Sequence, residues 1–309
     1  MIATAKKGLY KAFGLVIASD MILPELIQWK EEEKQVEVII SRKDLSDLWA
    51  TLLREEGSSV IVREKEVWFQ VPDTAIFCIR DGIEIIVSPF KAVAEDKVRL
   101  YILGTCMGVV LLQRKIISLH GSCIAIDGKA YAFVGESGAG KSTLASAFLK
   151  NNYTLLSDDV IAVSFPESHQ PFVFPSYPQQ KLWEESLNQF GMFSKQYQPL
   201  FERETKYAVP VGSSFDLKPV PLAGIFEIAK TDHDDIMIHQ INNLERFPIL
   251  YRHTYRSFLI QRLNLIDWHF NSTAKMLSHI KVWRIERPSS RFTANELVPL
   301  ILNHLNKEL

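Results

Sequence analysis

The chain has 309 residues, which is enough for one or two domains with a full hydrophobic core. Hydrophobic residues make up 47% of it and charged residues 23%, a composition that excludes a largely disordered chain. The 35 Lys and Arg residues nearly balance the 36 Asp and Glu residues. The resulting net charge of -1 argues against nucleic acid or an anionic membrane as a partner of the whole protein.

The cysteines and the N-terminal residues indicate a cytoplasmic protein. Cys78, Cys106 and Cys123 form no CxxC pair, which favours reduced thiols. The first twenty residues lack the apolar run of a signal peptide. The most apolar segment, residues 100–112, is shorter than a membrane-spanning helix and is interrupted by glycine, so no membrane partner is expected.

Residues 1–92 are predicted to form a β-rich N-terminal subdomain. One strand is expected over residues 8–19, another over 35–41, and closely spaced strands over 58–88. The short connections favour antiparallel hairpins and make a βαβ arrangement unexpected. The turn signals between these strands are Gly57, Pro72-Asp73 and Asp81-Gly82.

Residues 93–309 are predicted to form an α/β domain of the nucleotide-binding type. A buried linking helix is expected over residues 93–114, where apolar residues recur at helical spacing. The remaining expected elements are strands at 117–126, 131–135 and 154–165, a helix at 140–151, an insertion at 166–222 with a short helix at 180–190, strands at 222–240 and 282–288, helices over 243–279, and a closing helix capped by Thr293 with Glu296.

A phosphate-binding loop stands between the strand at 131–135 and the helix at 140–151. Such a loop turns several backbone N–H groups inward, which favours glycine, and the following helix points its positive end at the same anion. The lysine then reaches the outer phosphates, and the hydroxyl after it can bind Mg²⁺. The residues are Gly135, Glu136, Ser137, Gly138, Ala139, Gly140, Lys141 and Ser142, with Thr143 next to them.

Two further features narrow the chemistry. Asp158 and Asp159 follow Lys141 by 17 and 18 residues, and are expected at the end of a strand beside the loop, where carboxylates handle Mg²⁺ or an attacking group. His120 lies 21 residues before Lys141, at the expected end of the strand that enters the hairpin. Taken separately, a histidine in this position more often has a structural role, and the acidic pair is equally consistent with a turn and with a site.

The segment LHGSCIAIDGKAYAFVGESGAGKST, followed by LLSDD, resembles the C-terminal catalytic domain of HPr kinase/phosphorylase. The resemblance implies a P-loop core of that type and ATP- and Mg²⁺-dependent phosphorylation of a serine hydroxyl. On the matching positions it implies that Lys141 binds the β- and γ-phosphates and Ser142 the metal. Asp159 would accept the hydroxyl proton, His120 would assist or orient it, and Asp158 would support the metal or the base.

Within that family, the whole chain looks similar to lasso-peptide precursor kinases, which phosphorylate a C-terminal serine. A peptide or small protein is therefore the implied partner, and a homo-oligomer is compatible with the family. The sequence departs from the HPr enzymes in two places. Thr143 stands where those enzymes commonly have an acidic residue, and a later Glu-containing motif of those enzymes is missing. The nearest acidic residues to that motif are Glu184 and Glu185.

Cations are needed for the γ-phosphate and for a peptide carboxylate. Arg252 and Arg256 share a face of a predicted helix, and Arg203 and Lys206 lie in a loop-like stretch. We hypothesise that at least one of these pairs faces the site, the alternative being a solvated basic surface. Two other functions remain open: a kinase of a small-metabolite hydroxyl, and a non-catalytic nucleotide-binding sensor or scaffold.

Overall fold

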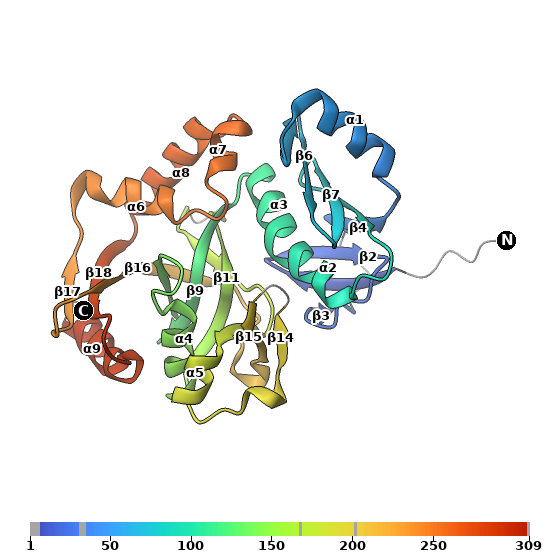
Figure 1. The fold of residues 1–309 in the computed structure, drawn as a ribbon. Helices are drawn as coiled ribbons and strands as arrows, with labels where there is room; N and C mark the ends of the chain where they lie inside the picture. Colours follow the sequence, from blue (N-terminus) through green and yellow to red (C-terminus); the bar gives the residue numbers. More distant parts are fainter. Residues whose placement is uncertain (1–6, 31–34, 167–168, 201–202, 308–309) are drawn as a thin grey trace. The chain divides into compact units, whose positions relative to one another are not determined.

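The chain folds into two compact units in the computed structural model (Figure 1). One comprises Met1–Ser118 with Arg256–His269, and the other Leu119–Tyr255 with Phe270–Leu309. Helices and mixed sheets together confirm the predicted α/β class, and the predicted boundary at residue 92 falls within the first unit. The residues that the structure describes are 7–30, 35–166, 169–200 and 203–307.

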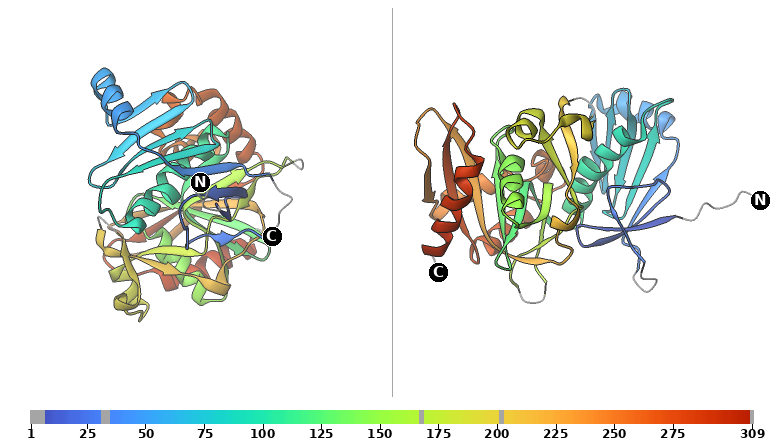
Figure 2. Two further views of the ribbon diagram at one scale, coloured as in Figure 1. Left: turned by 90° about the vertical axis from the view of Figure 1, so that its right-hand side faces the viewer. Right: turned by 90° about the horizontal axis from the view of Figure 1, so that it is seen from below.

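The first unit contains an eight-stranded mixed sheet with the order β3-β1-β2-β4-β8-β7-β6-β5. Its last four strands form an antiparallel meander, as predicted for residues 58–88, and are coloured light blue to cyan in Figure 2. The strands are β1 Gly8–Ala12, β2 Leu15–Ser19, β3 Ile27–Gln28, β4 Val38–Arg42, β5 Val60–Arg63, β6 Glu66–Val71, β7 Ala75–Arg80 and β8 Glu84–Pro89.

Two predictions for this unit were wrong. The single strand expected over residues 8–19 is a hairpin, because Phe13 and Gly14 both have positive φ (57° and 80°), as a two-residue hairpin turn requires. A helix, α1 (Ser46–Glu56), follows β4, and β4 pairs in parallel with β2 and with β8. Parallel neighbours need a crossover connection, and α1 lies within the one from β4 to β8.

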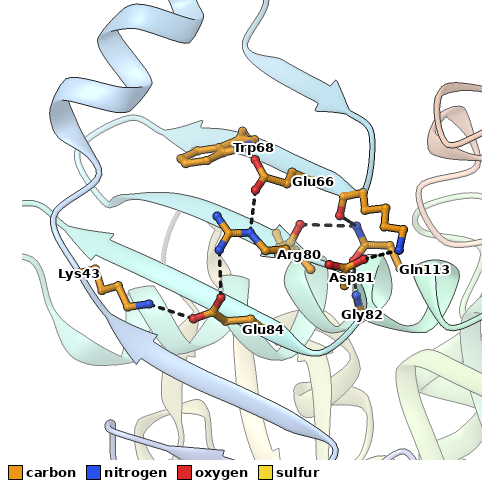
Figure 3. A network of polar contacts seen from close by, with 10 residues as sticks. Lys43, Glu66, Trp68, Arg80, Asp81, Gly82, Glu84 and Gln113 are labelled. Atoms are coloured by element: carbon orange, nitrogen blue, oxygen red, sulfur yellow. Dashed lines mark hydrogen bonds and ion pairs between the residues drawn. The ribbon is translucent and has the colours of Figure 1, made fainter.

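One face of β6, β7 and β8 divides into an apolar and a charged part. Trp68 packs under α1 against Trp49 in a buried cluster. Farther along the same face, the Arg80 side chain contacts Glu66 on β6 and Glu84 on β8 (Figure 3). These ion pairs are partly exposed, so they add little to stability and mainly mark where the apolar face ends.

The predicted linking helix is confirmed with an irregularity in its middle. It consists of α2 (Glu95–Tyr101), one π-helical turn at Ile102–Cys106 and α3 (Met107–Gln113). Its end is attached to the sheet of the same unit, because the Gln113 side chain accepts a hydrogen bond from the Gly82 N–H (2.7 Å) and donates one to the Lys65 carbonyl (2.8 Å). The three cysteines are free and buried.

The second unit contains a seven-stranded sheet with the order β10-β9-β11-β12-β16-β18-β17. Because β10 also pairs with β16, five strands close a ring of pairings. β10, β16 and β18 run parallel to one another. The strands are β9 Ile117–Ile126, β10 Lys129–Gly135, β11 Thr154–Ser164, β12 Phe172–Phe174, β16 Val220–Thr231, β17 Met237–Gln240 and β18 Lys281–Pro288.

Two helices pack against these parallel strands. α4 (Lys141–Lys150) and α9 (Ala294–Lys307) share one buried cluster with side chains of β10, β16 and β18. Phe226 is at its centre, stacked on Trp283 with ring centroids 4.6 Å apart. Phe133 on β10 stacks on Phe148 of α4 with ring centroids 5.6 Å apart, so aromatic packing holds α4 against the strand that precedes it.

The insertion was predicted less well. The short helix expected at 180–190 is present only as α5 (Glu184–Gln189), and the residues before it form a strand, β13 (Gln179–Trp183). Every residue of β13 pairs with β15 (Arg203–Pro210), and this long-range pairing outweighs local helix preference. β14 (Gln198–Leu200) completes a three-stranded sheet of the order β13-β15-β14.

The region predicted as helical over 243–279 contains one 3-10 turn and three helices. In chain order they are the turn Asn243–Glu245, α6 Arg246–Arg252, α7 Phe258–Arg262 and α8 Ile266–Leu277. Among the residues described, no helix is both long and apolar enough to cross a bilayer.

Candidate functional site

The phosphate loop joins the end of β10 to the start of α4. Gly135 is the last residue of β10 and has φ of 151°; a Cβ added to it would lie 2.5 Å from the Ile228 carbonyl oxygen on β16. Gly138 and Gly140 also have positive φ, 80° and 105°. No L side chain fits this path without strain, so the glycine spacing is dictated by the shape of the loop.

Lys141 is buried at the first turn of α4 and its side chain bends back over the loop. Its Nζ donates to the carbonyl oxygens of Gly135 (2.8 Å) and Glu136 (3.0 Å). Burial lowers the pKa of Lys141, although nearby Asp158 opposes the shift. An ammonium that is held only by neutral carbonyls and partly desolvated is available to an anion entering the loop.

The remaining loop side chains differ in exposure. Glu136 and Ser137 are exposed, and Ala139 is buried. Ser142 is half-buried, and the hydroxyl of its neighbour Thr143 lies 2.8 Å from that of Ser186 on α5. Thr143 therefore ties α4 to the insertion rather than facing the loop.

The acidic pair lies in the middle of β11 and not at a strand end, contrary to expectation. Asp159 has φ of +83°, a conformation rare for a residue other than glycine. The Ser157 hydroxyl bonds to the Val160 carbonyl across this point. Such a kink costs of order 1–3 kcal/mol and re-aims a side chain, and it is typical of functional sites.

Asp158 is 2% exposed, and the protein occupies both of its carboxylate oxygens. Oδ1 accepts from the Ser122 hydroxyl at 2.5 Å, and Oδ2 accepts from the backbone N–H of Lys181 at 2.8 Å. These bonds connect β9, β11 and β13, so Asp158 joins three strands that lie far apart in the sequence.

Asp159 lies between a lysine and a histidine. Its Oδ2 is 2.6 Å from Lys181 Nζ, and its Oδ1 is 3.4 Å from His120 Nδ1. Burial by itself would raise the pKa of Asp159, but the charge of Lys181, together with His120, outweighs burial and holds the pKa well below its usual range. The carboxylate is therefore ionised at neutral pH. The same pairing raises the pKa of Lys181 against the effect of burial.

His120 lies within β9, not at its end as predicted, and the structure brings it next to Asp159. Its Nδ1 is 3.0 Å from the Asp159 carbonyl oxygen. A carbonyl only accepts, so this bond requires the proton on Nδ1 and leaves Nε2 unprotonated in the neutral ring. Burial lowers the pKa of His120, with Asp159 opposing, so the neutral form dominates at neutral pH.

The four predicted substrate cations are in different places. Lys206 on β15 is near enough to Asp159, His120 and Lys141 to change the pKa of each, and its Nζ lies 5.4 Å from the Trp183 ring centroid. Arg203 begins β15, but its side chain is outside the described residues.

Arg252 and Arg256 contact other groups. Arg252 is exposed, with Nη1 3.9 Å from Glu227 Oε1, and Arg256 donates to the Thr105 hydroxyl at 3.0 Å. Of the four predicted cations, Lys206 is the one whose charge acts on Asp159, His120 and Lys141 together.

A buried carboxylate, Glu227 on β16, was not singled out from the sequence. It is 5% exposed and is contacted by His253 Nε2 (3.1 Å) and Arg284 Nε (2.9 Å). These partners lower the pKa of Glu227 against the effect of burial. The His253 carbonyl in turn accepts a hydrogen bond from the His120 N–H (2.7 Å), so this network supports the strand that carries His120.

Lys181 is the other functional candidate missed by sequence reasoning. Its neighbour Gln180 donates to the Ser142 carbonyl at 3.3 Å and accepts from the Ser146 hydroxyl at 2.8 Å, both on α4. Consecutive residues of β13 thus touch the helix after the phosphate loop and the acidic pair. A single lysine in a Pro- and Gln-rich segment carries no signal of this kind.

Oxygen ligands suited to Mg²⁺ are present at the loop. The Ser142 hydroxyl makes no hydrogen bond within the described chain, whereas both oxygens of Asp158 already accept one. Mg²⁺ is commonly held by one or two protein oxygens together with phosphates, so this donor set fits. Within the described chain, no group of three or more His, Cys, Asp or Glu side chains could hold a metal ion by itself.

A glycine loop between a parallel strand and a helix, with a buried lysine at its end, defines the second unit as an α/β domain of the P-loop class. No family model matches the chain. It is 36% identical over 70 residues to an HPr kinase/phosphorylase of Mycoplasmopsis pulmonis, an alignment covering 22% of this chain and 23% of the relative.

A second HPr kinase/phosphorylase, from Lachnoclostridium phytofermentans, is 29% identical over 119 residues, covering 35% of this chain and 37% of the relative. The matches therefore span about a quarter to just over a third of these relatives. A solved Hpr(Ser) kinase/phosphatase from Coxiella burnetii aligns with a TM-score of 0.34 and 15% identity, covering 62% of this chain and 97% of that one.

Proposed function

We propose that this protein is an ATP-dependent kinase that transfers the γ-phosphoryl group to a serine hydroxyl of a peptide or small protein. The observation that carries the proposal is the placement of an ionised, kinked Asp159, with His120 beside it, within electrostatic range of the phosphate-loop lysine. The similarity to two HPr kinase/phosphorylases supports the same reaction class.

The phosphate end of the site would work by charge neutralisation and positioning. In this proposal the backbone of residues 135–140 surrounds the phosphates, and Lys141 leaves its carbonyl partners to pair with the β- and γ-phosphates. Ser142 would hold Mg²⁺, which supplies further positive charge to the transferring group when bound. Asp158 would serve mainly to fix β13 beside β11, because its oxygens are already bonded.

The acceptor end would supply the base. The serine oxygen forms a bond to the γ-phosphorus while the bond from that phosphorus to the bridging oxygen of ADP breaks, and the hydroxyl proton passes to the Asp159 carboxylate. Lys181 keeps that carboxylate ionised, and His120 holds it from the other side. A carboxylate of low basicity suffices, because positioning and charge neutralisation dominate phosphoryl transfer.

The finer proposal is that the acceptor is the C-terminal serine of a lasso-peptide precursor. A terminal carboxylate lies a few bonds from the hydroxyl of such a serine, so it would need a cation beside the acidic pair. Lys206 acts electrostatically on Asp159, His120 and Lys141, and so supports this choice of acceptor.

The test is a transfer assay with the full chain and Mg-ATP. Peptides ending in a free serine carboxylate, the same peptides with a C-terminal amide, and peptides with an internal serine are compared by mass spectrometry. We expect phosphorylation of the free-acid peptide, reduced for the amide. Tight ATP binding without transfer to any hydroxyl would contradict the kinase proposal, and transfer only to free serine or a sugar would contradict a peptide acceptor.

A further inference from the structure

Two cations lie side by side at the carboxyl ends of neighbouring parallel strands in the second unit. Lys230 on β16 and Arg287 on β18 are paired in register, near the end of both strands. Ligands of α/β sheets bind at this edge, beyond the carboxyl ends of the strands. The preceding β10 ends in the phosphate loop at the same edge, because β10 runs parallel to β16 and Gly135 pairs with Ile228.

Arg287 contacts the loop backbone directly. Its Nε donates to the Ala139 carbonyl at 2.8 Å, and its Nη1 donates to the Pro288 carbonyl at 3.0 Å. Its Nη2 lies 3.3 Å from where a Cβ on Gly140 would stand. The guanidinium therefore reaches the part of the loop next to α4, while Lys141 reaches the carbonyls at the other end of the loop.

Among the residues that the structure describes, no carboxylate is close enough to Arg287 to form an ion pair with it. Arg287 makes no ion pair within the described chain, and burial lowers its pKa, with Glu185 the one carboxylate that opposes the shift. A partly buried guanidinium with unused N–H donors is costly without an anionic partner. The loop itself contributes only one carboxylate, Glu136, whose side chain is exposed.

Lys230 reaches the tip of the loop from the neighbouring strand. Its side chain is exposed, and its Nζ lies 3.8 Å from where a Cβ on Gly138 would stand. It has neither a hydrogen bond nor an ion pair within the described residues. Like charges directly opposite each other on paired strands destabilise a sheet, so Lys230 and Arg287 side by side favour binding of an anion between or above them.

We propose that Arg287 and Lys230 form a second cationic arm of the nucleotide site, which binds phosphate groups of the nucleotide at the Gly138–Gly140 side of the loop. This inference rests on the proposed function, because it assumes that the loop binds a nucleoside triphosphate. It adds two residues from β16 and β18 to a site that the loop motif alone would assign to residues 135–143. Arg287 also positions the loop through Ala139.

The experiment measures equilibrium binding of Mg-ATP and of magnesium tripolyphosphate, which lacks the nucleoside, by titration calorimetry on the full chain. The variants are Arg287→Gln, Arg287→Lys and Lys230→Gln. Lys281→Gln is the matched control, because Lys281 begins the same strand β18 at its opposite end. Lys141→Met reports whether the loop is the nucleotide site, and the melting temperature of each variant confirms that it folds.

We expect Arg287→Gln to weaken binding of both ligands about tenfold or more, as loss of a charged hydrogen-bond donor does. Lys230→Gln should weaken both about threefold, with a smaller effect at high salt because this side chain is exposed. Arg287→Lys should recover part of the loss, and Lys281→Gln should bind both ligands as the parent does.

Two results would overturn the inference and leave the proposed function standing. One is unchanged affinity of the Arg287 and Lys230 variants while Lys141→Met binds poorly. The other is weakened ATP binding with unchanged tripolyphosphate binding, which would assign the cations to the nucleoside. A parent chain that binds neither ligand would overturn the proposed function as well.

Discussion

The two ends of the candidate site are built in different ways. The phosphate loop is one contiguous segment, residues 135–143, and its lysine bonds to carbonyls of the same loop. The acceptor end takes His120 from β9, Asp159 from β11, Lys181 from β13 and Lys206 from β15. The first is therefore a local backbone structure, whereas the second exists only while four strands keep their places. Substitutions at the acceptor end should couple activity to stability more strongly.

The largest expected effect is at the loop lysine. Lys141→Met should reduce kcat/KM for ATP by about 10³–10⁵-fold, because it removes a preorganised charge from the transition state and a charged contact from the bound nucleotide. The melting temperature should change little, since Lys141 bonds only to loop carbonyls. Steady-state kinetics and calorimetry check this, and turnover within tenfold of the parent would exclude Lys141 from the reaction.

Asp159→Asn should separate binding from transfer. We expect kcat to fall about 10²–10⁴-fold, the usual contribution of a general base, while ATP affinity stays within about twofold of the parent. Lys181 loses its counter-charge in this variant, so the free energy of unfolding must be measured alongside. Unchanged kcat in a folded variant would show that another group takes the proton.

Asp158→Ala tests the structural half of the acidic pair. It leaves the Ser122 hydroxyl and the Lys181 N–H buried without their acceptor, and should lower the free energy of unfolding by about 1–3 kcal/mol for each group. Urea unfolding measures this loss. Ser122→Ala is the milder comparison, because it removes only one of the two hydrogen bonds to Asp158. Equal stability of the parent and both variants would contradict the role of Asp158 in joining β9, β11 and β13.

Acid should weaken the second unit through its depressed carboxyl pKa values. Asp159 and Glu227 have folded-state pKa values below their ordinary values of 3.8 and 4.5, so the unfolded chain binds more protons in this range. Their stabilisation is complete above the ordinary values and is lost as the pH falls below them. The pKa of His120 is lowered from 6.5, so protonation of this side chain also reduces the free energy of unfolding as the pH falls below 6.5. Urea unfolding at a series of pH values measures this dependence. Glu227→Gln should reduce the slope of the free energy of unfolding against pH in the acid range, and an unchanged slope would contradict this assignment.

The smallest effect is expected from the basic residues. Lys206→Gln should raise KM for the acceptor peptide about threefold to tenfold with ATP affinity unchanged, as for loss of one partly exposed charge pair. Arg252→Gln is the control, because Arg252 is exposed and its ion pair is with Glu227 and not with the acidic pair. Kinetics with the free-acid and amidated peptides measure both, and equal effects of the two substitutions would remove Lys206 from the acceptor site.

The site was predictable where its residues are close in sequence or have unusual types. The glycine spacing and Lys141 were readable because a phosphate loop needs positive φ at fixed offsets. Lys181 was missed because β13 was predicted as a helix, and a helix would not have placed residue 181 across from β11. Glu227 was missed because a lone glutamate in an apolar strand gives no sign that Arg284 and His253 surround it.

The sequence by itself determined the phosphate loop, the α/β class and the positions of most strands along the chain, because backbone conformation and hydrophobic periodicity are local properties of the chain. Tertiary structure alone decided three contacts. Asp159 forms an ion pair with Lys181, Asp158 accepts a hydrogen bond that joins neighbouring strands, and Arg287 donates a hydrogen bond to the Ala139 carbonyl. Strand pairing brings these groups together over long stretches of chain, and burial then fixes their charges, so neither contact nor charge state is written in any one segment.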